Sequence, residues 1–223
     1  MNEQLSDELR RILNACGSVG LPVIVIGAFS VQAYDCLFRT SGDLDLAIAS
    51  IHWPELKNTL ASLGYSVIAE GLWATVAKPI GEETLEVHIA LDNITDFNST
   101  VTFPVGGEQS ELHRPADLDF ALPVLPLEGV FLTKLIALRD KDIADLVGIL
   151  MNKADKMDSR RLWERVIAAN LQDFVENRLN ELIELLRGGE AMSAWYIATG
   201  QVLASEKSEA MEKTLRRLLK TRP

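Results

Sequence analysis

The spacing of apolar residues in the first fifty positions switches between a helical period and a strand period. Residues 3–16 carry apolar side chains at helical spacing, and glycines end this segment. The continuous apolar run at 21–26 is typical of a buried strand, and a second helix is predicted over 27–34. Apolar and polar residues alternate over 43–49, so we expect a half-buried strand there.

The middle of the chain continues with one helix and several strands. The pattern predicts a helix over 53–63, closed by a glycine, and strands over 65–69, 72–77 and 84–91. Between 92 and 122 the periodicity weakens and polar residues, glycine and proline are scattered among short apolar pieces. We expect loops and one or two short strands in this part.

After Pro123 the pattern becomes almost wholly helical. This change predicts an α/β (α+β) domain over residues 1–122 and a helical C-terminal domain over residues 123–223. The helices are expected near 126–152, 159–169, 171–187 and 204–220.

Composition indicates a protein of the reducing cytoplasm. The chain has 223 residues, of which 48% are hydrophobic, enough for one large domain or two small ones. Cys16 and Cys36 belong to no CxxC or zinc-ligand pattern, which argues against a disulfide framework. The N-terminus lacks the features of a signal peptide and no apolar run is long enough for a membrane span, so we expect no membrane association.

The charge balance argues against broad nucleic-acid binding. With 32 acidic and 22 basic residues the formal net charge is −10, so the average field repels a phosphate backbone. Residues 206–222 hold six basic and three acidic side chains. A solvated helix end is the favoured interpretation of this tail, and an RNA-contacting tail is the alternative.

Two carboxylates on the strand predicted over 43–49 form a candidate metal site. Asp43 and Asp45 lie on one face of this strand, roughly 6 to 7 Å apart at the backbone, and can share a cation. Oxygen ligands with open positions suit Mg²⁺, which completes its shell with water and phosphate oxygens. Glu86 and His88 share the polar face of the strand predicted over 84–91. If the two strands pair, Glu86 would be the third ligand of a two-metal site for nucleotidyl transfer.

Each of these features also has an ordinary structural interpretation. An Asp-x-Asp pair occurs in solvated turns, in calcium loops and in sugar-nucleotide-dependent glycosyltransferases. Gly27, which follows a predicted strand, either forms a phosphate-approach turn or merely caps that strand. Trp53, Trp73, Trp163 and Trp195 are interpreted as core or interface anchors.

Three sequence blocks together resemble a known family. They are Ile26-Gly-Ala-Phe-Ser-Val-Gln-Ala-Tyr34, Arg39-Thr-Ser-Gly-Asp-Leu-Asp-Leu46, and a helical stretch from Leu132 to Leu146 that contains Lys-x4-Arg-Asp-x-Asp-x-x-Asp. The chain resembles nucleotidyltransferases related to the AbiEii abortive-infection toxins, over about residues 22–150. The resemblance implies a nucleotidyltransferase core with a mixed sheet, followed by a helical C-terminal region.

The resemblance also implies a set of site residues. Asp43, Asp45 and Glu86 would bind metal, Mg²⁺ or Mn²⁺, with Glu86 standing where Asp is common. Asp142 would position the acceptor or act as a base, supported by Asp145 and Arg139. Lys134 would contact a phosphate, although spacing alone favours a lysine that snorkels from an amphipathic helix. Asp142 and Asp145 could equally be ordinary helix-surface or helix N-terminal acids. The residues implied to bind the nucleotide are Gly27, Ala28, Ser30, Arg39, Lys134 and Arg139, with Ala28 at a position where the family often has Gly or Ser.

We therefore expect an enzyme that transfers a nucleoside monophosphate from a nucleoside triphosphate to a hydroxyl of tRNA or protein. The resemblance suggests a toxin of a toxin–antitoxin or phage-defence system, with a cognate antitoxin or toxin protein as its partner. A small-molecule acceptor stays open, as does a non-catalytic binding or antitoxin module. A glycosyltransferase ranks last, because only about forty residues precede Asp43.

Overall fold

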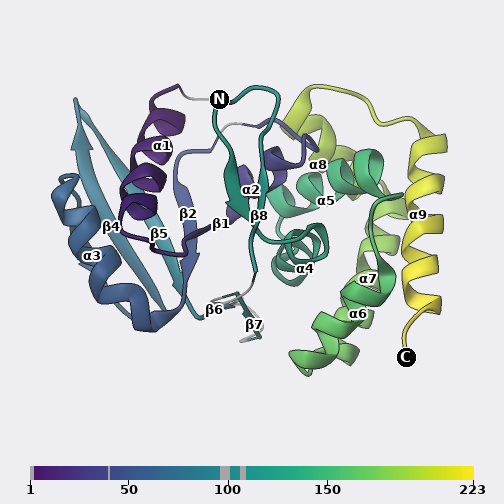
Figure 1. Cartoon of the computed structure of the whole chain (residues 1–223). Helices are drawn as coiled ribbons and strands as arrows, with labels where there is room; N and C mark the ends of the chain where they lie inside the picture. The colour runs from purple at the N-terminus through teal and green to yellow at the C-terminus, as the bar shows by residue number, and fades with distance from the viewer. Residues whose placement is uncertain (1–2, 40, 96–100, 106–108) are drawn as a thin grey trace. The chain divides into compact units, whose positions relative to one another are not determined.

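The computed structural model describes residues 3–39, 41–95, 101–105 and 109–223. It confirms the predicted fold class, a mixed sheet with helices followed by a helical C-terminal region (Figure 1). The residues group into two compact units. A sheet unit comprises Met1–Tyr34 and Thr40–Pro126, and a helical unit comprises Asp35–Arg39 and Leu127–Pro223. The division into domains at residue 122 stays a prediction.

The sheet unit is built on seven described strands in the order β3-β4-β5-β2-β1-β9-β8. The sheet is mixed, because β2 runs parallel to β5 and β1 parallel to β9, while the other neighbours are antiparallel. The elements are α1 (Glu3–Ser18), β1 (Ile24–Val25), α2 (Gly27–Ala33), β2 (Leu44–Ile48), η1 (Ser50–His52), α3 (Trp53–Ser62), β3 (Ser66–Ala69), β4 (Trp73–Ile80), β5 (Glu83–Leu91), β8 (Glu111–His113) and β9 (Leu122–Val124), with β6 (Asn93–Thr95) and β7 (Thr102–Pro104) forming a separate pair.

A buried carboxylate holds α1 against the rest of this unit. Helices α1 and α3 both lie over the β4–β5 side of the sheet (Figure 1). Glu8 of α1 accepts hydrogen bonds from Lys78 Nζ at 2.9 Å and from the Tyr65 hydroxyl at 3.0 Å. Burial raises the pKa of Glu8, but the bonds from Lys78 and Tyr65 outweigh it and hold the pKa below its ordinary value. Glu8 therefore stabilises the fold in its ionised form.

The register between β2 and β5 separates an apolar face from a polar one. Leu44 pairs with Val87 and Leu46 with Ile89, and these four side chains are fully buried. Asp45 pairs with His88 in the same register. Because directly paired residues of neighbouring strands point to the same side, the polar side chains of both strands gather on the opposite face.

The helical unit contains two more helices than the sequence pattern predicted, because one predicted helix is divided in two and α8 is additional. Its helices are α4 (Leu127–Ala137), α5 (Asp140–Lys153), α6 (Ser159–Ala168), α7 (Gln172–Gly188), α8 (Glu190–Thr199) and α9 (Ser205–Lys220). The single helix expected over 126–152 is wrong. Leu138 has a φ of 45°, and Arg139 is extended and caps α5. Helix α8 was not predicted at all.

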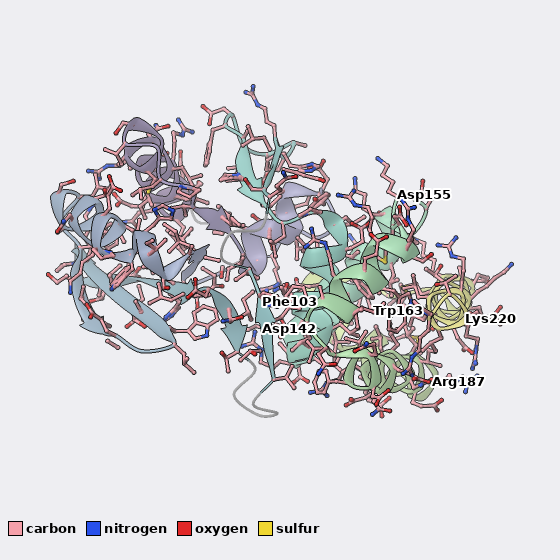
Figure 2. All side chains as sticks on the ribbon, turned by 60° about the horizontal axis from the view of Figure 1, so that its bottom comes forward. Phe103, Asp142, Asp155, Trp163, Arg187 and Lys220 are labelled. Atoms are coloured by element: carbon pink, nitrogen blue, oxygen red, sulfur yellow. The ribbon has the colours of Figure 1, made fainter. Side chains whose placement is uncertain are left out.

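Packing around Trp163 joins α6 to the last helix. The side chain is 1% exposed, and its Nε1 donates a hydrogen bond to the Leu218 carbonyl at 2.9 Å. Figure 2 shows Trp163 pointing toward α9, which is seen along its axis. The interpretation of Trp163 as a core anchor is confirmed. None of the helices in the described ranges is both long and apolar enough to cross a membrane.

Candidate functional site

The polar face of β2 and β5 gathers the residues that were predicted to bind metal in the sheet unit. Asp43 directly precedes β2, and its Oδ1 accepts a hydrogen bond from Ser41 Oγ at 2.8 Å. His88 Nε2 lies 3.8 Å from Asp43 Oδ2 and 3.7 Å from Glu86 Oε2. Its Nδ1 lies 3.3 Å from Thr75 Oγ1. The predicted condition for Glu86, that its strand pairs beside the aspartate strand, is therefore met.

Asp45 packs directly against Gly27 at the start of α2. A Cβ atom added at Gly27 would lie 2.1 Å from Asp45 Oδ2, and Gly27 has a φ of +67°. Both the close approach and the left-handed backbone require glycine at this position. Gly27 is thus more than the end of a strand, because it makes room for a carboxylate of the candidate site.

The other predicted residues at the start of α2 face inward. Ser30 is 2% exposed, and its hydroxyl donates a hydrogen bond to the Gly27 carbonyl at 2.8 Å. Ala28 is also buried, at 4% exposure. In this structure the hydroxyl of Ser30 stabilises the first turn of α2, and its contact with a triphosphate stays a prediction.

The donor chemistry of this face suits a hard divalent cation. Asp43 and Glu86 offer carboxylate oxygens from side chains that are 35% and 47% exposed, so water and phosphate oxygens can complete a shell. Within the described ranges, however, no three His, Cys, Asp or Glu side chains are already gathered as a metal-binding group. Asp43, Asp45 and Glu86 thus remain a predicted ligand set.

Replacing Gly27 with alanine tests the contact with Asp45. We expect Gly27→Ala to lower the free energy of unfolding by about 2 to 3 kcal/mol, because backbone strain adds to a collision with the carboxylate. Gly20→Ala is the matched control, since Gly20 has a φ of +73° but an added Cβ would meet no atom within 4 Å. Urea unfolding of both variants measures the difference, and equal losses would show that the Asp45 contact contributes nothing.

A series of ion pairs in the helical unit connects the other residues that were predicted to belong to the site. Arg39 binds Asp145 through two hydrogen bonds, of 2.8 Å from Nε and 2.9 Å from Nη2. Lys134 Nζ lies 2.7 Å from Asp145 Oδ2 and 3.2 Å from Asp142 Oδ1. Arg139 Nε donates to Asp142 Oδ2 at 2.6 Å. Positive and negative groups therefore alternate from Arg39 to Arg139.

Burial decides between the interpretations left open for this cluster. Lys134, Asp142 and Asp145 are 4%, 0% and 1% exposed, so the snorkelling lysine and the helix-surface acids are wrong. The alternative of a helix N-terminal acid holds for Asp142, which lies in the first turn of α5 and caps it together with Arg139. Burial raises the pKa of Asp142, but Lys134 and Arg139 together hold it below its ordinary value. Asp142 is thus an ionised, fully paired carboxylate, which favours a positioning role over that of a base. The pairing of Arg39 with Asp145 was not predicted, because 106 residues separate them.

The sheet unit thus places an Asp-x-Asp pair at the start of β2, with Asp45 against the glycine that begins α2. Residues 1–186 match the family described as "Uncharacterised nucleotidyltransferase", and the chain belongs to this family. The resemblance found in the sequence is thereby confirmed at the level of the family. No curated protein matches the sequence.

Solved structures share the fold at low sequence identity. JHP933 from Helicobacter pylori is 14% identical and has a TM-score of 0.59, with 100% of this chain and 94% of that chain covered. MenT4, a nucleotidyltransferase toxin from Mycobacterium tuberculosis H37Rv, is 15% identical and has a TM-score of 0.51, with 96% of this chain and 82% of that chain covered. At these identities the similarity establishes the fold.

Proposed function

We propose that this protein is a metal-dependent nucleotidyltransferase that moves a nucleoside monophosphate from a nucleoside triphosphate to an acceptor hydroxyl. The observation that carries the proposal is the packing of Asp45 against Gly27. It brings a carboxylate of the Asp-x-Asp pair to the first turn of α2. Backbone N–H groups at a helix start attract phosphate, and carboxylates attract the cations that accompany phosphate.

In the proposed reaction the acceptor oxygen bonds to the α-phosphorus as the bond from that phosphorus to the bridging oxygen breaks. Pyrophosphate leaves, and the proton of the acceptor hydroxyl passes to solvent. Asp43, Asp45 and Glu86 would hold Mg²⁺ or Mn²⁺, which when bound neutralises charge on the triphosphate. The N–H groups at Gly27 and Ala28 would orient the triphosphate.

The cluster of the helical unit would supply the cationic contacts. Arg139, whose side chain is 55% exposed, and Arg39 are the proposed triphosphate contacts. Asp142 and Asp145 orient these guanidinium groups through the hydrogen bonds described above. Lys134 neutralises both carboxylates. We therefore propose that it does not contact the nucleotide directly, but fixes the two carboxylates that orient the arginines.

For the acceptor we propose a hydroxyl of tRNA or of a protein, within a toxin–antitoxin or phage-defence system that includes a cognate partner protein. The shared fold of the toxin MenT4 supports this proposal. The net charge of −10 disfavours a large RNA, and on that observation a small-molecule acceptor is the second candidate.

A transfer assay tests the proposal. The protein is incubated with each α-labelled nucleoside triphosphate, Mg²⁺ or Mn²⁺, and total tRNA, cell lysate or a panel of small hydroxyl compounds. We expect metal-dependent label on one acceptor class with the wild type and none with the Asp43→Ala/Asp45→Ala variant. Absence of both transfer and metal-dependent triphosphate binding would instead support a non-catalytic binding or antitoxin module.

A further inference from the structure

One face of α5 is adapted to hold a short segment from the first part of the chain. Asp145, Gly148 and Asn152 are spaced three and four residues apart, so they follow one another along a single face of the helix. Residues 35–39 belong to the same compact unit as α5, although the residues on either side of them belong to the sheet unit. The segment contacts all three positions of this stripe.

The contacts run in order along both partners. Asp145 binds Arg39 through two hydrogen bonds, and Asn152 Nδ2 donates to the Cys36 carbonyl at 3.0 Å. Between them, Gly148 lets the segment approach the helix. A Cβ at Gly148 would lie 2.8 Å from the Cys36 carbonyl oxygen and 3.0 Å from Leu37 Cβ. Hydrogen bonds thus hold both ends of the segment, and its middle requires a residue without a side chain on α5.

Core packing of Cys36 and Leu37 accounts for only part of this arrangement. Asn152 lies in an exposed position, yet its amide bridges two backbone carbonyls, of Cys36 and of Gly148. Glycine is unfavourable inside a helix, and α5 retains it where the segment comes closest. Burial raises the pKa of the Cys36 thiol to about 12, so the segment is not held there for thiol chemistry.

We propose that Asp145, Gly148 and Asn152 form a clasp that positions Arg39, a proposed triphosphate contact of the helical unit. Asn152 holds the segment at Cys36, three residues before Arg39, and Gly148 lets the backbone between them lie against α5. This inference rests on the proposed function for its catalytic consequence, and it makes Gly148 and Asn152 positioning residues for Arg39.

Two variants loosen the clasp by different means. Asn152→Ala removes the hydrogen bond to Cys36 from an exposed position, so the fold should be retained. Gly148→Ala pushes the backbone of the segment away while raising the helical propensity of α5. Asn180→Ala is the matched control, because Asn180 Nδ2 donates to the carbonyl four residues earlier, as Asn152 does, but is not among the contacts of the segment.

Amide hydrogen exchange without metal or nucleotide is the first measurement. We expect exchange about fivefold faster than in the wild type over residues 35–39, in both clasp variants but not in Asn180→Ala. Wild-type exchange over residues 35–39 in both clasp variants would overturn the clasp. This measurement tests the clasp independently of activity. A wild type that transfers no nucleotide would contradict only the proposed function.

The transfer assay then separates positioning from general weakening. Asn152→Ala is expected to lower kcat about tenfold while the KM for the nucleotide changes less than about twofold. Asn152→Gln keeps the amide donors and should recover most of the lost rate. An unchanged kcat in Asn152→Ala, alongside an active wild type, would overturn the catalytic role of the clasp.

Discussion

Asp45→Asn is expected to reduce nucleotidyl transfer at least about 10³-fold. Asparagine has nearly the same shape as aspartate, so the contact with Gly27 and the pairing of β2 with β5 should persist. The substitution removes the negative charge that attracts a divalent cation. We therefore expect the affinity for Mn²⁺, measured by titration calorimetry, to fall together with the rate, while the free energy of unfolding changes by less than about 1 kcal/mol.

Asp92→Asn is the matched control for this substitution. Asp92 follows β5 directly, six residues after Glu86, and accepts a hydrogen bond from the Ser50 N–H at 2.8 Å. Its φ of 63° is well tolerated by asparagine. The control should keep wild-type transfer. Full activity in Asp45→Asn would remove the Asp-x-Asp pair from the proposed mechanism.

Lys134→Met is expected to lower the free energy of unfolding at pH 7 by about 3 to 5 kcal/mol. The methionine fills a similar volume, but Asp142 and Asp145 lose the ammonium group that lies between them. A lysine that served only to contact phosphate would leave stability unchanged when replaced. Urea unfolding of the protein without nucleotide distinguishes the two roles.

The pH dependence of this loss follows from the pKa of Asp142. Because that pKa is lowered in the folded wild type, its contribution is present above the ordinary value near 3.8 and is lost as the pH falls through the folded pKa. In Lys134→Met the carboxyl can protonate at higher pH, so the gap to the wild type should narrow as the pH falls from the pKa of Asp142 in the variant to its lower pKa in the wild type. Lys141→Met, at an exposed position of α5, is the control and should stay within about 0.5 kcal/mol of the wild type. A gap that is constant with pH would contradict the assignment.

Local sequence patterns predicted the parts of the fold that repeat over a few residues. The alternation around Asp43 and Asp45 placed both on one strand face, and the same reasoning put Glu86 and His88 on the polar face of β5. The pairing of these two strands could be stated only as a condition, because single-strand periodicity contains no information about which strands are neighbours. The structure supplies that pairing.

The errors arose where no local signal marks the structure. The break between α4 and α5 falls at Leu138, which adopts a φ of 45° without glycine or proline nearby. Helix α8 directly follows Gly189, whose φ is +95° and which lies at the end of α7 and at the start of α8. In the sequence, the pair Gly188-Gly189 indicated only that a helix ends there. The stripe of Asp145, Gly148 and Asn152 resembles ordinary helix composition until its distant partner is known.

The place of residues 35–39 in the helical unit also sets the order in which the protein can be completed during synthesis. Arg39 is made 106 residues before Asp145, and a ribosome adds about 5 to 20 residues per second. The segment therefore waits about 5 to 20 s, longer still for Asn152, before its partners on α5 exist. During this interval Arg39 and the apolar residues of the segment lack α5, the helix against which they pack in the finished protein. The helical unit therefore cannot be completed from the last part of the chain alone, because it includes five residues made before most of the sheet unit.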